Sequence, residues 1–328
     1  MSHALATRRT VLRSMAALGC AAAGSSAFAQ GYPSRPVRII IPFGPGGVGD
    51  ISIRIVADKL SEKFGRRFII ENMPSPDGIV AGRTVISAAA DGHTLLLLTG
   101  GTAASLALYN KFPLDIFKDL VPVSSIGFFD CLMVVNAQSE FQTLGDIIKA
   151  GKAKPGGLSV GTVITGGVQN LTTNYFKQAS GLDFVIVPFR TTPDATVALM
   201  RNDVQLVIDF YAPLKPGLEG HQLRALAWTG PTPSPALPEV KTAREQGIKD
   251  FAAASWNSLY VKTGTPPEIV ATLNTALHEV LADPDVKKRL LEFGVDSRAN
   301  TPAEMDAQLR DDAKKWADVI ARAGIEKH

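Results

Sequence analysis

Short apolar runs alternate along the chain with longer segments in which apolar residues recur every three or four positions. The first run, residues 38–41, is rich in β-branched residues and predicts a buried strand. Residues 51–64, which follow a glycine-rich turn, have the spacing of a helix with one apolar face. Further strands are predicted at residues 67–71, 95–98, 121–128, 131–135, 158–160, 184–189, 204–210, 223–228 and 252–261.

Helical segments lie between these predicted strands, and this alternation predicts an α/β fold whose parallel sheets carry helices on both faces. The pattern starts again at Thr143, where Asp146 follows at the spacing of a capping box. After residue 266 the chain turns helical, and Thr301 with Glu304 forms a second capping box before the last helix. No low-complexity linker separates the halves, so we expect two α/β lobes with a hinged cleft between them.

Four turns rich in glycine, threonine and small residues lead from predicted strands into predicted helices. They are residues 44–50, 99–103, 165–170 and 190–193. In open α/β sheets ligands bind at this edge, and a helix N-terminus offers free N–H groups and a positive dipole end to an anion. Each half supplies two of the turns, which favours an anion site in the cleft, although ordinary helix capping explains any single turn.

The first turn has two interpretations. Gly44, Gly46 and Gly49 match the dinucleotide-binding fingerprint, and Glu71 ends the next strand where a ribose-binding acid would stand. This would make the chain an exported NAD(P)-dependent oxidoreductase. The other interpretation is a small carboxylate held by the turn without any cofactor. Pro45 removes one N–H and stiffens the turn, which argues against a bound pyrophosphate, but these residues alone leave both interpretations open.

Residues 1–29 predict an export signal. Arg8, Arg9 and Arg13 precede a weakly apolar stretch that ends in the small-residue cleavage site Ala27-Phe28-Ala29, and the paired arginines favour the twin-arginine route over ordinary secretion. Without these residues the chain keeps 31 basic and 31 acidic residues. No basic stripe remains to attract nucleic acid or a membrane surface, and no apolar run is long enough to span a bilayer. We therefore expect a periplasmic protein without nucleic-acid or membrane partners of that kind.

The chain lacks a recognisable catalytic set. Its five histidines show no metal-ligand spacing, no G-x-S-x-G motif is present, and Cys131 is the single cysteine after residue 29. The pair Asp311-Asp312 is expected on a solvated helix face. We therefore expect a protein that is not an enzyme and that holds neither a metal nor a cofactor.

Two charged residues at predicted strand ends are more informative. Arg190 has the fork geometry that pairs with a carboxylate, although a structural salt bridge is the alternative. Asp209 would orient a ligand or close the hinge. Tyr211 and Trp256 are either walls of the cleft or core aromatics.

An ordered set of short motifs resembles one known family. The motifs are Tyr32-Pro33-Ser34-Arg35-Pro36, Ile41-Pro42-Phe43 with Pro45-Gly46-Gly47 and Asp50, Glu71-Asn72, Asp91-Gly92-His93-Thr94-Leu95-Leu96, Lys152-Ala153-Lys154-Pro155-Gly156, Leu223-Arg224-Ala225-Leu226-Ala227, Ser234-Pro235-Ala236-Leu237-Pro238 and Gly264-Thr265-Pro266. Together they resemble the Bug family of tripartite tricarboxylate transporter substrate-binding proteins (TctC-like), over essentially the whole chain after the signal.

This resemblance implies a type II periplasmic binding protein whose two α/β lobes close on a small organic carboxylate. Residues 30–131 with 255–328 would form one lobe and residues 132–254 the other. The expected partners are subunits of a tripartite tricarboxylate-type membrane transporter, or alternatively a sensor kinase, and the receptor is expected to be a monomer.

The resemblance also implies which residues bind the ligand. They are Phe43, Gly46, Gly47, Val48, Asp50, Thr102, Ala103, Thr165, Gly166, Gly167, Val168, Gln169, Phe189, Arg190, Thr191 and Asp209. Three departures from the family pattern, at residues 48–49, 167–169 and 189–191, remove or change polar side chains. They predict a more apolar pocket, which favours an aromatic or longer aliphatic carboxylate, with a dicarboxylate as the alternative.

Overall fold

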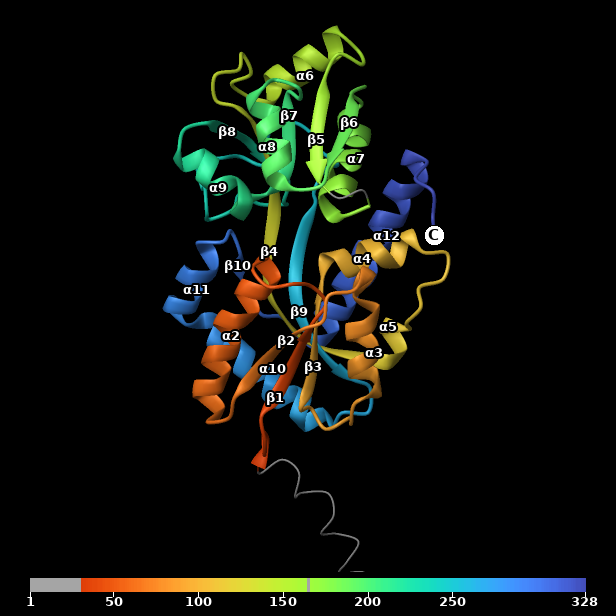
Figure 1. Ribbon diagram of the computed structural model, residues 1–328, viewed down its shortest axis with the longest axis vertical. Helices are drawn as coiled ribbons and strands as arrows, with labels where there is room; N and C mark the ends of the chain where they lie inside the picture. The colour runs from red at the N-terminus through yellow and green to blue at the C-terminus, as the bar shows by residue number, and fades with distance from the viewer. Residues whose placement is uncertain (1–30, 164–165) are drawn as a thin grey trace, which may run out of the picture.

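The computed structural model describes residues 31–163 and 166–328. The predicted export signal and the candidate ligand residue Thr165 lie outside the described residues. Two lobes stand one above the other, with the strands β4 and β9 running between them (Figure 1). We call them the lower and the upper lobe, as they lie in that view.

The lower lobe is a mixed sheet with strand order β2-β1-β3-β9-β4. β1 (Val37–Ile41) pairs in parallel with β2 (Phe68–Asn72) and β3 (Thr94–Thr99), while β9 (Ala254–Lys262) runs antiparallel to β3 and β4. Helices α2 (Val48–Phe64), α10 (Pro267–Ala282) and α11 (Pro284–Leu291) cover one face. Helices α3 (Ile79–Ser87), α4 (Gly100–Leu108) and α12 (Pro302–Ala323) cover the other.

Strand β1 shows why its apolar run is continuous. Ile39 and Ile41 face the helices on one side of the sheet, and Ile40 faces those on the other. A strand buried on both faces has no polar side to present, so the short β-branched run predicts it well.

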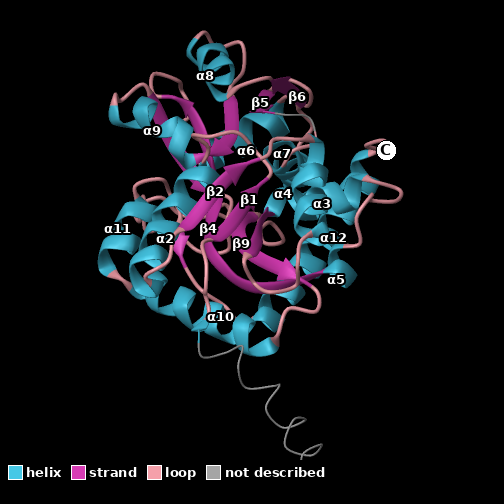
Figure 2. Ribbon diagram, turned by 60° about the horizontal axis from the view of Figure 1, so that its bottom comes forward, coloured by secondary structure: helices cyan, strands magenta, loops and turns pink. Residues whose placement is uncertain are grey.

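The upper lobe repeats this arrangement on a smaller scale (Figure 2). β5 (Ser159–Val163) pairs in parallel with β6 (Val185–Phe189) and β7 (Leu206–Phe210), and β8 (Leu223–Trp228) runs antiparallel to β4. Helices α6 (Leu144–Ala153) and α7 (Val168–Ser180) pack on one face, and α8 (Thr192–Met200) and α9 (Tyr211–Glu219) on the other. The elements that remain are η2 (Pro76–Gly78), α5 (Ile116–Asp119) and β10 (Asp296–Ser297).

The prediction of separate strands at 121–128 and 131–135 is wrong, because these residues form the single strand β4 (Leu120–Asn136). This strand pairs with β9 as far as Asp130 and with β7 from Cys131 onward. Asp130 does not interrupt the strand, because it lies where the chain leaves one core and enters the next. The sheets are therefore mixed rather than purely parallel.

Two predicted helix starts are confirmed. Thr143 and Thr301 each form the capping box that the sequence predicts. The N-cap of α8 is Thr191, and its Oγ1 accepts the N–H of Asp194 across 3.3 Å. None of the helices in the described ranges has both the length and the apolar character needed to cross a bilayer.

Candidate functional site

The loops β1–α2 and β5–α7 are built alike, one in each lobe. Gly46 and Gly166 have positive φ angles of 97° and 77°, a region that side chains disfavour. Gly47 and Gly167 follow in extended conformation and are the N-caps of α2 and α7. The same run of two glycines and a valine thus makes the same turn twice.

A side chain four residues on holds each loop. The N–H of Gly46 donates to the Asp50 carboxylate across 3.0 Å, and the N–H of Gly166 donates to Asn170 Oδ1 across 3.2 Å. No cap side chain bonds to the first turn of either helix, since both N-caps are glycines. The N–H groups of these two turns therefore point toward the space in front of the loops, as an anion site requires.

Asp50 shapes its loop from within the protein. It is 2% exposed, lies in the first turn of α2 rather than at the N-cap, and accepts bonds from Arg54 (2.8 Å) and Asn72 (3.0 Å). Burial acts to raise the pKa of Asp50, but the hydrogen bonds from Arg54, Asn72 and Gly46 outweigh it and lower the pKa to about 2. Asp50 is therefore ionised at neutral pH, and its carboxylate is bonded to groups of the protein itself.

In the turn at residues 99–103, hydroxyl groups cap the helix. Thr99 is the N-cap of α4 and accepts the N–H of Gly101 across 3.1 Å, while Thr102 Oγ1 accepts the N–H of Thr99 across 3.4 Å. Here the ordinary capping explanation is sufficient. Thr102 nevertheless borders the cleft, whereas Ala103 is fully buried in the core behind it.

A cavity of about 830 Å³ lies between the lobes, bordered by α4, the η2 turn, the β5–α7 loop and residues 325–328. It reaches Pro42 and Phe43 at the start of the β1–α2 loop, but Gly46, Gly47 and Val48 do not line it in this structure. Its volume is within the usual size range of small-molecule sites. The lining residues are Pro42, Phe43, Ser75, Asp77, Gly78, Leu98, Thr99, Gly101, Thr102, Ala104, Ser105, Leu108, Gly166, Gly167, Ile325, Glu326 and His328. Four of the predicted ligand residues thus line the cavity, namely Phe43, Thr102, Gly166 and Gly167.

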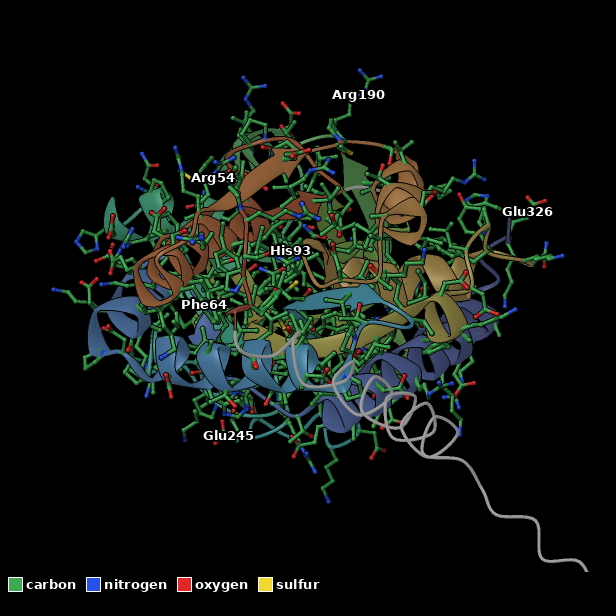
Figure 3. The ribbon with its side chains drawn as sticks, turned by 90° about the horizontal axis from the view of Figure 1, so that it is seen from below. Arg54, Phe64, His93, Arg190, Glu245 and Glu326 are labelled. Atoms are coloured by element: carbon green, nitrogen blue, oxygen red, sulfur yellow. The ribbon has the colours of Figure 1, made fainter. Side chains whose placement is uncertain are left out.

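The fourth turn carries no side chain into this cavity. Arg190 is exposed, and Figure 3 shows it at the edge of the molecule. Thr191 is the N-cap of α8 and donates its hydroxyl to Asp194 across 2.7 Å. Phe189 ends the edge strand β6 beside them.

Asp209 lies behind the loops of the upper lobe and is fully buried. Its carboxylate accepts bonds from the side chains of Gln169 (3.2 Å) and Thr192 and from the N–H of Phe210 (2.7 Å). Burial raises the pKa of Asp209 even though these bonds act to lower it. Asp209 therefore ties the start of α7 to the start of α8, a positioning role.

Asp77 lines the cavity but is not among the ligand residues predicted from the sequence. It has a positive φ of 51°, which is uncommon for a residue with a side chain. Its carboxylate accepts hydrogen bonds from two hydroxyl groups, that of Ser105 in α4 (2.7 Å) and that of Tyr109 at the C-terminal end of α4 (2.6 Å). An aspartate between proline and glycine is a turn signal, but the sequence does not show that α4 stands opposite.

Two aromatic candidates are core residues. Trp256 is fully buried, and its Nε1–H donates to Asp312 Oδ2 across 2.8 Å. Tyr211 is 8% exposed and packs on Trp228. The expectation that Asp312 lies on a solvated face is therefore wrong, because the indole of a different segment covers it, while Asp311 is exposed.

The lobes also touch on both sides of the cavity. Gln178 of α7 donates to the carbonyl of Val319 in α12 across 3.0 Å. On the opposite side, Lys215 of α9 donates to the carbonyl of Glu292 across 3.2 Å. The lobes are also joined by apolar packing, since Val168 and Leu171 of α7 belong to the same buried cluster as Trp316 of α12.

The residue that the nucleotide interpretation needs is already occupied. Glu71 receives two bonds from Arg38, of 2.6 and 2.7 Å, on the neighbouring strand. This bidentate ion pair fixes the Glu71 carboxylate against β1 and offsets its charge, which gives Glu71 a structural role without any nucleotide.

The sequence profile described as "Tripartite tricarboxylate transporter family receptor" matches residues 52–325. The chain belongs to this family. It is 30% identical to protein BugT of Bordetella pertussis, over 91% of this chain and 92% of that one. This confirms the resemblance seen in the sequence.

Two solved structures of similar fold have their ligands named. Rpa4515 of R. palustris with adipate is 30% identical, with a TM-score of 0.77, and the match covers 90% of this chain and all of that one. MatC of Rhodopseudomonas palustris with bound malate is 29% identical, with a TM-score of 0.72, over 88% of this chain and all of that one. Members of this family are receptors rather than enzymes, so the family gives no support to an oxidoreductase.

Proposed function

We propose that this receptor captures a small organic carboxylate in the cavity between its lobes and delivers it to a tripartite tricarboxylate-type membrane transporter. The observation that carries the proposal is the pair of matching loops, one from each lobe, with glycine N-caps and helix N-termini. Oriented N–H groups and the positive ends of two helix dipoles favour an anion. The named ligands of the two similar structures, adipate and malate, are both carboxylates.

Binding would be coupled to movement of the lobes. A carboxylate that bonds to both loops gains its full set of contacts only when the lobes are close, so it favours the closed state by its differential affinity. The strand β4 changes partner between Asp130 and Cys131, which supports the expected division of the chain near residues 131 and 255. The transporter would then recognise the closed form.

The site residues proposed from the sequence take four roles in this scheme. Gly46, Gly47, Val48, Gly166 and Gly167 would contact the carboxylate through their backbone. Phe43 and Thr102 would line the cavity. Asp50, Gln169 and Asp209 hold the loops in position, and Arg190 and Thr191 lie at the outer edge of the upper lobe, where they would contact the ligand only on closure. A sensor kinase in place of the transporter would use the same binding chemistry.

Thermal unfolding of residues 30–328 with a panel of mono- and dicarboxylates tests the proposal. A ligand at about 100 times its dissociation constant should stabilise the protein by roughly 2.7 kcal/mol. NADH and NADPH serve as comparison compounds. Stabilisation by a nucleotide and by none of the carboxylates would show that the proposal is wrong.

A further inference from the structure

Asp77 brings a negative charge to one wall of the cavity between the lobes. It stands in η2, directly before Gly78, and both residues have positive φ angles, 51° and 71°. Gly78 lies so close to Pro42 that a Cβ there would come within 2.9 Å of that ring. The turn is therefore fixed in place against the end of β1, and the position of Asp77 is fixed with it.

Two hydroxyl groups orient the carboxylate of Asp77. Ser105 bonds one oxygen across 2.7 Å and Tyr109 bonds the other across 2.6 Å, and both donors come from the side of α4. Each carboxylate oxygen accepts more than one bond, so both keep capacity for a further donor. Asp77 is exposed, and in this structure its exposed side borders the cavity.

The lining as a whole has an unusual charge for a receptor of anions. Among the described residues that line the cavity, the ionisable ones are Asp77, Glu326 and His328, and none is a lysine or arginine. Glu326 is exposed at the rim (Figure 3). We expect the carboxylate of a ligand to lie away from Asp77, on the backbone N–H groups of Gly166 and Gly167 in the glycine loop that borders the cavity, because like charges at close range repel by several kcal/mol inside a protein.

We propose that Asp77 binds the end of the ligand opposite its carboxylate, and that this ligand is a monocarboxylate with a hydroxyl or ammonium group at that end. The inference rests on the proposed function, because it assumes that the glycine loops hold the carboxylate. A second carboxylate would meet Asp77 without a cation to offset it. A hydroxyl or ammonium group would instead donate a hydrogen bond to an oriented acceptor.

This specificity differs from that of the two similar structures, whose named ligands are dicarboxylates. A site built to bind a donor rejects an analogue that lacks one, since its own polar group is then left unpaired. Ser105 and Tyr109 would act as positioning residues for Asp77 in this arrangement.

Two series of equal chain length test the inference by isothermal titration calorimetry on residues 30–328. The first comprises adipate, hexanoate, 6-hydroxyhexanoate and 6-aminohexanoate, and the second comprises succinate, butyrate, 4-hydroxybutyrate and 4-aminobutyrate. We expect the hydroxy or amino member of one series to bind at least about tenfold more tightly than the dicarboxylate of the same length. A dicarboxylate that binds as tightly as either would overturn the inference while the proposed function stood.

The variant Asp77→Asn assigns the preference to this residue. Asparagine tolerates positive φ, so the turn is expected to survive, and Asp77→Gly provides a second replacement that fits the same φ. In both variants, the affinity for the amino member of a series should exceed that for the dicarboxylate of the same length by much less than in the wild type. Asp203→Asn, an exposed aspartate in the turn that leads into β7, is the matched control and should keep it.

Two further results of these titrations would contradict the role of Asp77. A wild-type preference that Asp77→Asn and Asp77→Gly leave unchanged would show that another residue creates it. If no member of either series binds the wild-type protein, the proposed carboxylate site is wrong for ligands of this size, and the inference about Asp77 is wrong with it.

Discussion

Gly46 donates its backbone N–H to the carboxylate of Asp50 across 3.0 Å, and this bond closes the first loop on itself. The second loop is closed in the same way by Asn170, a neutral amide, over 3.2 Å. Since an amide oxygen is sufficient in the upper lobe, the loop bond itself does not need a charge. The charge of Asp50 instead pairs with Arg54 in the next turn of α2.

Replacement of Asp50 should separate these two functions. Asp50→Asn keeps an acceptor for Gly46 and should cost on the order of 1–2 kcal/mol of unfolding free energy, because it loses the ion pair with Arg54. Asp50→Ala removes the acceptor of the Gly46 N–H together with that of the Arg54 and Asn72 side chains, and it should cost about 2–4 kcal/mol and weaken ligand binding as well. Urea unfolding at pH 7 measures the loss of stability, and calorimetric titration with a carboxylate that binds the wild-type protein measures the loss of affinity. Equal losses in the two variants would contradict this account.

The ionisation of Asp50 also predicts a dependence on pH. Its pKa in the folded protein is lowered to about 2 from an ordinary value of 3.8, so the folded state binds fewer protons between these values. The resulting stability, about 2 kcal/mol, is present above pH 4 and is lost as the pH falls toward 2. The difference between wild type and Asp50→Asn should therefore shrink on acidification. A difference that stays constant from pH 7 to pH 2 would show that the charge contributes nothing.

Glycine is required at only one of two nearby positions in the first loop. Gly46 has a φ of 97°, so Gly46→Ala should cost about 1–2 kcal/mol and reduce ligand affinity as the loop N–H groups shift. Gly44 has no positive φ, and no heavy atom lies within 4 Å of the point where a Cβ would stand, so Gly44→Ala should leave stability and binding within error of wild type. Thermal unfolding and calorimetry of both variants measure this contrast. A loss of similar size at Gly44 would show that its flexibility, and not the backbone angle of Gly46, matters.

The neighbours Asp311 and Asp312 should differ sharply in stability tests. Asp312 is 4% exposed and accepts bonds from Trp256 (2.8 Å) and Lys315 (2.7 Å), whereas Asp311 is exposed. Asp312→Ala should cost about 2–3 kcal/mol, because a buried indole N–H loses its partner, and Asp311→Ala should cost less than about 0.5 kcal/mol. Urea unfolding compares the two. Trp256→Phe should lower the cost of losing Asp312, which a double-mutant cycle detects.

This pair shows where prediction from the sequence stops. Helical spacing correctly places the last helix and its capping box at Thr301, because both are local features. It cannot place Trp256 over Asp312, because those residues come from a strand and a helix 56 positions apart. For the same reason Asp77 could not be recognised, since its partners Ser105 and Tyr109 belong to a later helix and its end.

The glycine loops were predictable as turns with open helix N-termini, because positive φ and absent side-chain caps follow from the residue types themselves. The continuity of β4 through Asp130 could not be predicted in this way. A polar residue inside an apolar run usually ends a strand on one face of a sheet, but Asp130 lies where the strand passes from one lobe to the other. That passage depends on the arrangement of two cores, which no short window of sequence contains.

Asp130 is half-buried at this crossing, with its carboxylate against the backbone of Gly230. Burial raises the pKa of Asp130 to about 7. The charge of Asp296 also acts to raise this pKa, and the charges of Arg298 and Lys315 act to lower it. Between the ordinary value of 3.8 and 7 the folded protein thus binds more protons at this group than the unfolded chain does. Its contribution therefore makes the protein less stable as the pH rises through this window, by about 2–4 kcal/mol in all.

Asp130→Asn removes this titration while keeping the size of the side chain. The variant should match wild type near pH 4, where the wild-type carboxyl is largely protonated in the fold, and should be the more stable of the two at pH 8, where that carboxyl is charged. Urea unfolding at pH 4, 6 and 8 measures the difference, and Asp311→Asn is the matched control on an exposed position. A gap that does not widen with pH would mean that water reaches the carboxylate at the crossing freely enough to leave its proton affinity ordinary.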